Sequence, residues 1–148
     1  NCNNDYGKKI KILIKKNQMN SSVTWTGPLY GKMKWDAFRA SSLFCLTSHQ
    51  ENFGISIVEA LSCGKPVLIT NKVNIYREIK KYKAGFISND TELGTIKNLK
   101  QWLSFSKKEY KQMSINAFKC FKNNFHIQHA VRKLHNKIEF DLTNKKKL

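Results

Sequence analysis

The chain has 148 residues, 41% of them hydrophobic and 11% aromatic, and its formal net charge is +17. This composition excludes an intrinsically disordered chain, and no apolar run reaches the roughly 20 residues that a membrane span needs. No signal peptide opens the sequence and residue 1 is Asn rather than Met, so we expect one cytoplasmic domain, residues 1–148, cut from a longer protein.

Hydrophobic spacing predicts two helices and two strands in the first third of the chain. Apolar residues recur at helical intervals over residues 5–18 and again over 31–41. The run VTWTG at 23–27, followed by Pro, predicts a short strand and a turn. The continuous apolar run LFCLT at 43–47 predicts a buried parallel strand.

The rest of the chain continues this alternation. A helix over about 55–63 should end at Gly64, because glycine suits the left-handed position after a helix and Pro66 cannot continue one. Further elements are predicted as a strand at 66–70, a helix at 75–81, a strand at 84–88, a helix from 91, a helix behind the capping box of Ser106 and Glu109, a helix at 127–142 and a basic tail at 143–148. The pattern predicts an α/β fold, a Rossmann-like parallel sheet with helices on both faces.

Cysteine and histidine do not indicate a metal site or a disulfide framework. The four cysteines include no Cys-x-x-Cys pair, and we interpret Cys45 and Cys63 as small core residues of a protein in a reducing compartment. His126 and His129 could share a helix face, but no third ligand lies near them in the sequence. We therefore predict no metal.

The positive charge is almost entirely lysine and has two explanations. Abundant Lys, Asn and Ile together are typical of AT-rich coding, in which case the lysines simply cover solvated faces. Alternatively the charge attracts an anionic partner, which could be a phosphate ligand, an acidic membrane surface or nucleic acid.

A candidate site follows the strand predicted at 43–47. Ligands of parallel sheets bind beyond the carboxyl ends of the strands, where Gly54 permits a tight backbone approach and the next helix directs its free N–H groups outward. Glu51 lies in this loop and Glu59 on the helix, and carboxylates can hold the hydroxyls of a ribose. The alternative is that Glu51 caps the helix and Glu59 is an exposed helix residue.

The segment ENFGISIVEALSCGKPVL at 51–68 resembles the signature of the family 4 (group 1) retaining glycosyltransferases, in which two glutamates are separated by seven residues. The segments VTWTGPL, SSLFCLTSHQENFG, NKVNIYREI, AGFIS and FHIQHA follow in the family's order, so the resemblance covers about residues 6–142. It implies the carboxyl-terminal, donor-binding half of a two-domain GT-B fold. Thr47 stands where the family commonly has Pro.

The resemblance implies a role for each motif residue. Glu59 should bind the ribose hydroxyls of a nucleotide sugar, and Glu51 should be catalytic, beside the transferred sugar. The distal phosphate should be held by the backbone of Phe53, Gly54 and Ile55. Asn52 and Ser56 should assist in donor binding, and the base pocket should be lined by Gly27, Pro28 and Leu29.

The same resemblance implies a function. A UDP- or GDP-sugar would be the donor, and retaining hexosyl transfer would go to a glycan or lipid-linked acceptor in polysaccharide or cell-envelope biosynthesis, without a metal or other cofactor. The family's amino-terminal acceptor domain and its Arg/Lys pair are not found in this sequence, so we expect these 148 residues alone to be inactive. Peripheral contact with the anionic inner face of the membrane is a further expectation.

Two other classes of function are kept open. One is a basic nucleic-acid- or membrane-binding α/β module without catalysis, although no recognised nucleic-acid motif is present and aromatic residues do not interleave with basic ones. The other is a GT-B relative such as a nucleotide-sugar epimerase, or a degenerate interaction domain.

Overall fold

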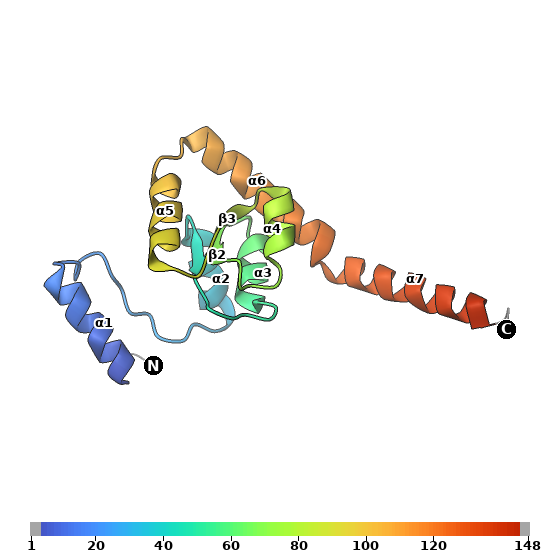
Figure 1. Ribbon diagram of the computed structural model, residues 1–148, viewed down its shortest axis with the longest axis horizontal. Helices are drawn as coiled ribbons and strands as arrows, with labels where there is room; N and C mark the ends of the chain where they lie inside the picture. The colour runs from blue at the N-terminus through green and yellow to red at the C-terminus, as the bar shows by residue number, and fades with distance from the viewer. Residues whose placement is uncertain (1–3, 146–148) are drawn as a thin grey trace. The chain divides into compact units, whose positions relative to one another are not determined.

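A computed structural model describes residues 4–145 (Figure 1). The chain divides into two compact units, Asn1–Ala37 and Phe38–Leu148, which are described one at a time. Among residues 4–145, no helix combines the length and the apolar character that a membrane crossing requires.

The first unit contains helix α1 (Asp5–Lys16) and an irregular segment that leads to α2 (Gly31–Ala40), a helix that continues into the second unit. Asn4 caps α1, because its side-chain oxygen accepts a 2.7 Å hydrogen bond from the Gly7 N–H. The Lys11 ammonium lies 5.9 Å from the centre of the Trp25 ring. Both predicted helices of this part of the chain are therefore confirmed.

The strand predicted at 23–27 is wrong. These residues form no ladder and no isolated bridge with any other described residue. Val, Thr and Trp favour strands because they fit a pleated, half-buried surface, and that surface exists only where a neighbouring strand supplies hydrogen bonds. Residues 23–27 therefore form no strand despite their strand propensity, because no described strand pairs with them.

The second unit is built on a three-stranded parallel sheet with the order β1-β2-β3. Its strands are β1 (Phe44–Leu46), β2 (Val67–Thr70) and β3 (Gly85–Ser88). The central strand β2 is buried along its whole length. Gly85 cannot be replaced easily, because a Cβ there would lie 2.0 Å from the carbonyl oxygen of Val67.

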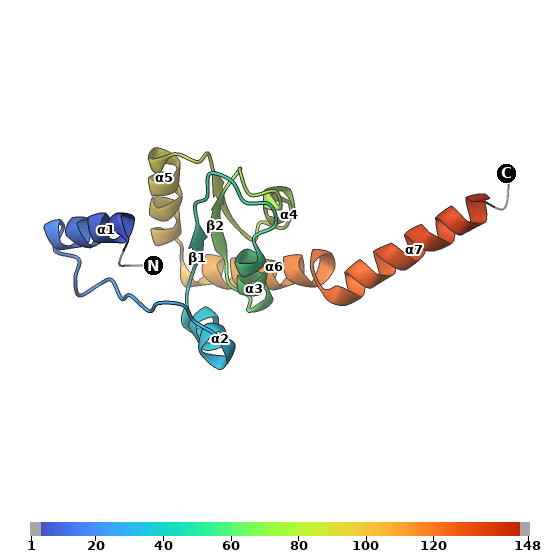
Figure 2. The ribbon, with the colours of Figure 1, turned by 90° about the horizontal axis from the view of Figure 1, so that it is seen from below.

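Helices cover both faces of this sheet, which confirms the predicted α/β, Rossmann-like class. Helix α5 (Glu92–Leu103) lies on one face, and α3 (Ile55–Ser62), α4 (Tyr76–Tyr82) and α6 (Lys107–Asn124) lie on the other (Figure 2). Strand register explains the division, since Phe86 points toward α5 and meets the rings of Trp102 and Phe105. The opposite face receives the buried Ile57, Leu61 and Ile79. Helix α7 (Ile127–Lys145) follows α6 and is exposed over residues 131–143.

The cysteine predictions were only partly right. Cys45 is exposed, because β1 is an edge strand and Cys45 faces the α5 side of the sheet, where α5 packs against β2 and β3. Cys63 is half-buried at the end of α3. Cys120 is fully buried, and this burial, with a smaller contribution from Glu78, raises the pKa of its thiol to about 12.

The helix boundaries follow the predicted capping signals closely. Gly64 adopts a left-handed conformation with φ of +66° directly after the end of α3, and Ser106 and Glu109 form the capping box of α6. Helix α7 continues to Lys145, so residues 143–145 of the predicted tail are helical, and 146–148 lie outside the described residues.

Candidate functional site

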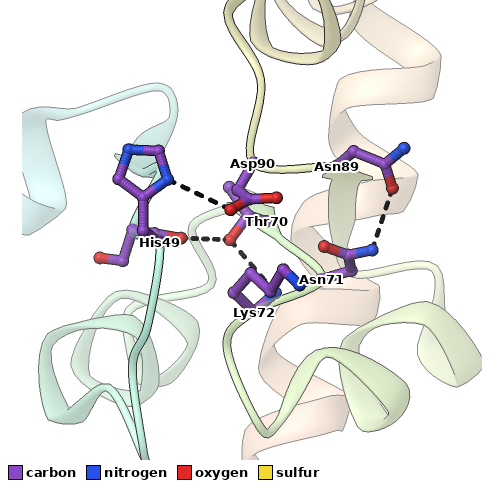
Figure 3. Close-up of polar contacts among 7 residues, drawn as sticks. His49, Thr70, Asn71, Lys72, Asn89 and Asp90 are labelled. Atoms are coloured by element: carbon purple, nitrogen blue, oxygen red, sulfur yellow. Dashed lines mark hydrogen bonds and ion pairs between the residues drawn. The ribbon is translucent and has the colours of Figure 1, made fainter.

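Three loops meet where the strands of the sheet end (Figure 3). The Thr70 hydroxyl, at the end of β2, donates a 2.5 Å hydrogen bond to the carbonyl oxygen of Ser48, in the loop after β1. His49 Nδ1 lies 3.2 Å from Asp90 Oδ2, which joins the loops after β1 and β3. Asn71 completes the set with a 3.0 Å hydrogen bond from its Nδ2 to Asn89 Oδ1. These contacts tie the three loops into one polar edge.

Glu51 is held at this edge by its backbone. Its N–H donates to the carbonyl oxygen of Lys72 at 3.2 Å, and its own carbonyl accepts from the Asn74 N–H at 3.1 Å, forming a parallel bridge with Val73. Asn74 also donates from its side chain to Asn52 Oδ1 at 3.0 Å. Hydrogen bonds to the loop after β2 therefore hold the loop after β1 in its conformation.

Gly54 turns this loop into helix α3. It is the N-cap of α3 with φ of +71°, a left-handed conformation that glycine adopts without strain. Its N–H donates a 3.2 Å hydrogen bond to Glu51 Oε1. The carboxylate thus lies at the positive end of the helix dipole, as the capping alternative for Glu51 predicted.

The other motif residues lie on and around the first turn of α3. Phe53 and Ile55 are 47% and 69% exposed, whereas Gly54 between them is buried. The Phe53 ring packs edge-to-face on Phe125, with centroids 5.9 Å apart. Glu59 is half-buried and follows Ser56 by three residues and Ile55 by four, which places it on the same helix face as that turn. A helix start beside two carboxylates suits recognition of a ligand that carries both phosphate and hydroxyl groups.

Gly27 and Pro28, predicted to belong to a base pocket, line a cavity of about 720 Å³ inside the first unit. Tyr6, Ile10 and Trp25 supply its apolar wall. Leu29 is half-buried and does not belong to the described residues that line this cavity. The structure brings Glu51 and Gly54 into contact, but these three residues belong to the other unit of the chain.

Sequence reasoning missed the polar residues that join the loops, namely His49, Thr70, Asn71, Asn89 and Asp90. Their signal was available, because each lies at or within three residues of the end of a strand and parallel strands end at one edge. The hydrogen bond with His49, followed by contacts within its own backbone, holds the pKa of Asp90 below its ordinary value, so its carboxylate stays charged at this edge.

Within the part of the chain that the structure describes, no group of three or more His, Cys, Asp or Glu side chains is arranged to hold a metal ion. The polar edge is instead made of carboxylates, amides, an imidazole and a hydroxyl. Whether the protein works without a metal stays a prediction.

Comparison with known proteins places these features in a family. Residues 3–120 match the family described as glycosyl transferases group 1. The chain is 30% identical over 71 residues to mannosylfructose-phosphate synthase of Agrobacterium fabrum, a match that covers 48% of this chain and 16% of the relative. It is 43% identical over 47 residues to D-inositol 3-phosphate glycosyltransferase of Gordonia bronchialis, covering 32% and 10% of the two chains. The matched segments therefore span less than a fifth of either curated relative.

Solved structures agree on the fold. Sucrose-phosphate synthase from Thermosynechococcus elongatus superposes with a TM-score of 0.76 at 16% identity, over 95% of this chain and 35% of that one. The N-terminal domain of Candida albicans trehalose-6-phosphate phosphatase superposes with a TM-score of 0.65 at 13% identity, over 91% and 31%. Because the family match extends over residues 3–120, far more than half of the 148, the chain belongs to the group 1 glycosyltransferases.

Proposed function

We propose that this chain binds a nucleoside-diphosphate sugar at the polar edge of its sheet and supplies the donor half of a glycosyltransferase. The observation that carries the proposal is the junction of Glu51, Gly54 and α3 in a member of this family. A left-handed glycine at a helix start exposes backbone N–H groups to a phosphate, and a nearby carboxylate is suited to accept hydrogen bonds from hydroxyls.

The distal phosphate of the donor binds at the first turn of α3 in this proposal. The N–H groups of Phe53, Gly54 and Ile55 would donate to it, because these residues lie just before and at the start of α3, where N–H groups have no intrahelical acceptors. Ser56 and Asn52 lie beside this turn and add polar contacts. The positive end of the helix dipole offsets the charge that develops on the departing diphosphate.

Glu51 then has two alternative partners. In the structure its carboxylate accepts the Gly54 N–H, the group that the phosphate would take over. A bound phosphate would displace the carboxylate, which becomes available to the hydroxyls of the transferred sugar. Glu51 is thereby the proposed catalytic carboxylate, and Glu59, on the same helix, the proposed ligand of the ribose.

The remaining parts of the proposal concern the whole protein. Gly27, Pro28 and Leu29 would contact the nucleotide base, and the donor would be a UDP- or GDP-sugar. Retaining transfer of a hexosyl group would go to a glycan or lipid-linked acceptor, in polysaccharide or cell-envelope biosynthesis. No cofactor is required in this scheme, because backbone N–H groups and the helix dipole carry out the charge stabilisation that a metal could otherwise provide.

Substitution of Glu59 tests the ribose contact. A hydrogen bond to a charged group contributes about 1.5–3 kcal/mol, so Glu59→Ala should weaken UDP or GDP binding about 10- to 100-fold. Isothermal titration calorimetry measures this affinity. Glu139→Ala is the matched control, since Glu139 is an exposed glutamate on α7. Equal nucleotide affinity in the wild type and Glu59→Ala would remove Glu59 from this role, and failure of the wild type to bind either nucleotide would refute the donor site.

A further inference from the structure

A second cleft, of about 480 Å³, follows the free edge of β3. All four residues of β3 line it, together with Lys80 on α4, Lys83 just after α4, and Asn98 and Gln101 on α5. Among the described residues β3 pairs with β2 alone, so the cleft runs beside a strand edge that no other described strand covers. It is therefore a cavity with an unpaired strand as one wall.

Two polar atoms at this cleft are buried without a partner. Within residues 4–145, Ser88 Oγ and Asn98 Nδ2 are the buried side-chain nitrogen and oxygen atoms that make no hydrogen bond. Asn98 is only 6% exposed. Most buried polar groups in proteins have a hydrogen-bond partner, so each unpaired group requires an explanation. A bound ligand that accepts hydrogen bonds is one such explanation.

The position of Asn98 makes this observation stronger. Asn98 lies on the same face of α5 as Gly94 and Trp102, four residues before and after it, and Trp102 packs against Phe86 of the sheet. An apolar side chain is the ordinary occupant of such a face, because it loses no hydrogen bonds on burial. Burial of the unpaired Asn98 amide therefore lowers the stability of the fold, and a hydrogen bond to a bound ligand would offset this loss.

The electrostatics of the cleft select the charge of that ligand. Lys80 and Lys83 line it, and none of its lining residues, all of which lie in the described part of the chain, is Asp or Glu. The free edge of β3 adds backbone groups to the lining of the cleft. Val67 N–H donates to Ala84 and Asn71 N–H to Ser88, so alternate residues face β2, and both the N–H and the C=O groups of Gly85 and Ile87 point to the free edge. Cations and neutral donors without a carboxylate favour an anion.

We propose that this cleft binds the phosphate group of a small phosphorylated ligand. Lys80 and Lys83 neutralise the phosphate. Side-chain rotations bring the Ser88 hydroxyl and the Asn98 Nδ2 group, both of which are buried in the structure, into the cleft as hydrogen-bond donors. This site is additional to the proposed donor site at the start of α3 and does not depend on it.

The test is a titration of the ¹⁵N-labelled chain, followed by NMR, with inorganic phosphate in one arm and glucose 6-phosphate in the other. We expect chemical-shift changes at the backbone amides of Gly85 and Ile87 and at the side-chain amides of Asn98 and Gln101. Tighter binding of the ester would show that the cleft also recognises the organic part of the ligand. Absence of shifts at these groups with both probes would overturn the proposal.

Two variants and one control distinguish a specific phosphate site from the general attraction of anions to a basic protein. Lys80→Gln/Lys83→Gln should weaken binding about tenfold or more, whereas the control Lys81→Gln/Lys111→Gln removes two exposed lysines that do not line the cleft and should leave the affinity unchanged. Asn98→Leu should lose phosphate binding while the chain stays folded. Equal losses in both lysine doubles, or full affinity in a folded Asn98→Leu, would contradict the proposal.

Discussion

Gly54 and Gly64 flank the same helix, α3, and both have left-handed backbones, with φ of +71° and +66°. Their surroundings differ. A Cβ on Gly54 would lie 2.6 Å from Ile57 Cδ1 and 3.3 Å from Glu51 Cγ, whereas on Gly64 the nearest atom would be Ser114 Oγ at 3.4 Å. Ile57 is fully buried and has little room to move. Substitution of Gly64 therefore tests backbone strain alone, whereas substitution of Gly54 adds a steric overlap.

Gly64→Ala should destabilise the fold by about 1 kcal/mol, the cost of a left-handed alanine, and Gly54→Ala should cost more because the clash with Ile57 is added. Urea denaturation of both variants measures the difference. Nucleotide binding should be impaired in Gly54→Ala alone, because only Gly54 lies beside Glu51. If the two variants were equally stable, the predicted overlap at Gly54 would be absent.

At the scale of elements, helix α6 is stabilised by a capping box at its N-terminus. Ser106 N–H donates to Glu109 Oε2 at 2.8 Å, and the Glu109 N–H donates back to the Ser106 hydroxyl at 3.3 Å. The hydrogen bond from the Ser106 hydroxyl, and then that from its backbone, lowers the pKa of Glu109 below 4.5. A depressed carboxyl pKa contributes stability above the unfolded value and loses it as the pH falls through the folded value.

Ser106→Ala should therefore destabilise the chain by about 1 kcal/mol at neutral pH, as loss of an N-cap does, and the gap from the wild type should narrow below about pH 4. Thermal unfolding at a series of pH values provides the measurement. Ser42→Ala, at an exposed serine between α2 and β1, is the control. A gap that stayed constant down to pH 2 would show that Glu109 does not contribute through its charge.

The cap signals also explain why the helices could be predicted well. Asn4, Thr91 and Ser106 each accept a hydrogen bond from the backbone N–H three residues later, and Gly64 follows a helix end, so the information lies within a few residues. The strand expected at 23–27 depended on a partner elsewhere in the chain. A local pattern could not show that this partner is missing from the described residues.

At the scale of the whole molecule, the net charge of +17 is the dominant electrostatic property. If it attracts an anionic membrane surface, the chain should co-sediment with vesicles that contain acidic lipid and not with neutral vesicles, at about 0.15 M salt. The effect should disappear at about 1 M salt, because screening then shortens the range of the interaction. Equal sedimentation with both vesicle types would leave lysine-rich composition as the better account. Duplex DNA in the same assay tests the nucleic-acid alternative.

The sequence by itself determined the α/β class, the helix ends and the family, because periodicity, caps and the spacing of Glu51 and Glu59 are local properties of the chain. Only the tertiary structure decided that Cys45 is exposed, that Glu51 forms a bridge with Val73 and that His49 meets Asp90. Each of these depends on which strands pair and where helices cover them. Contacts between residues far apart in sequence follow from strand order and packing, and no short segment contains that information.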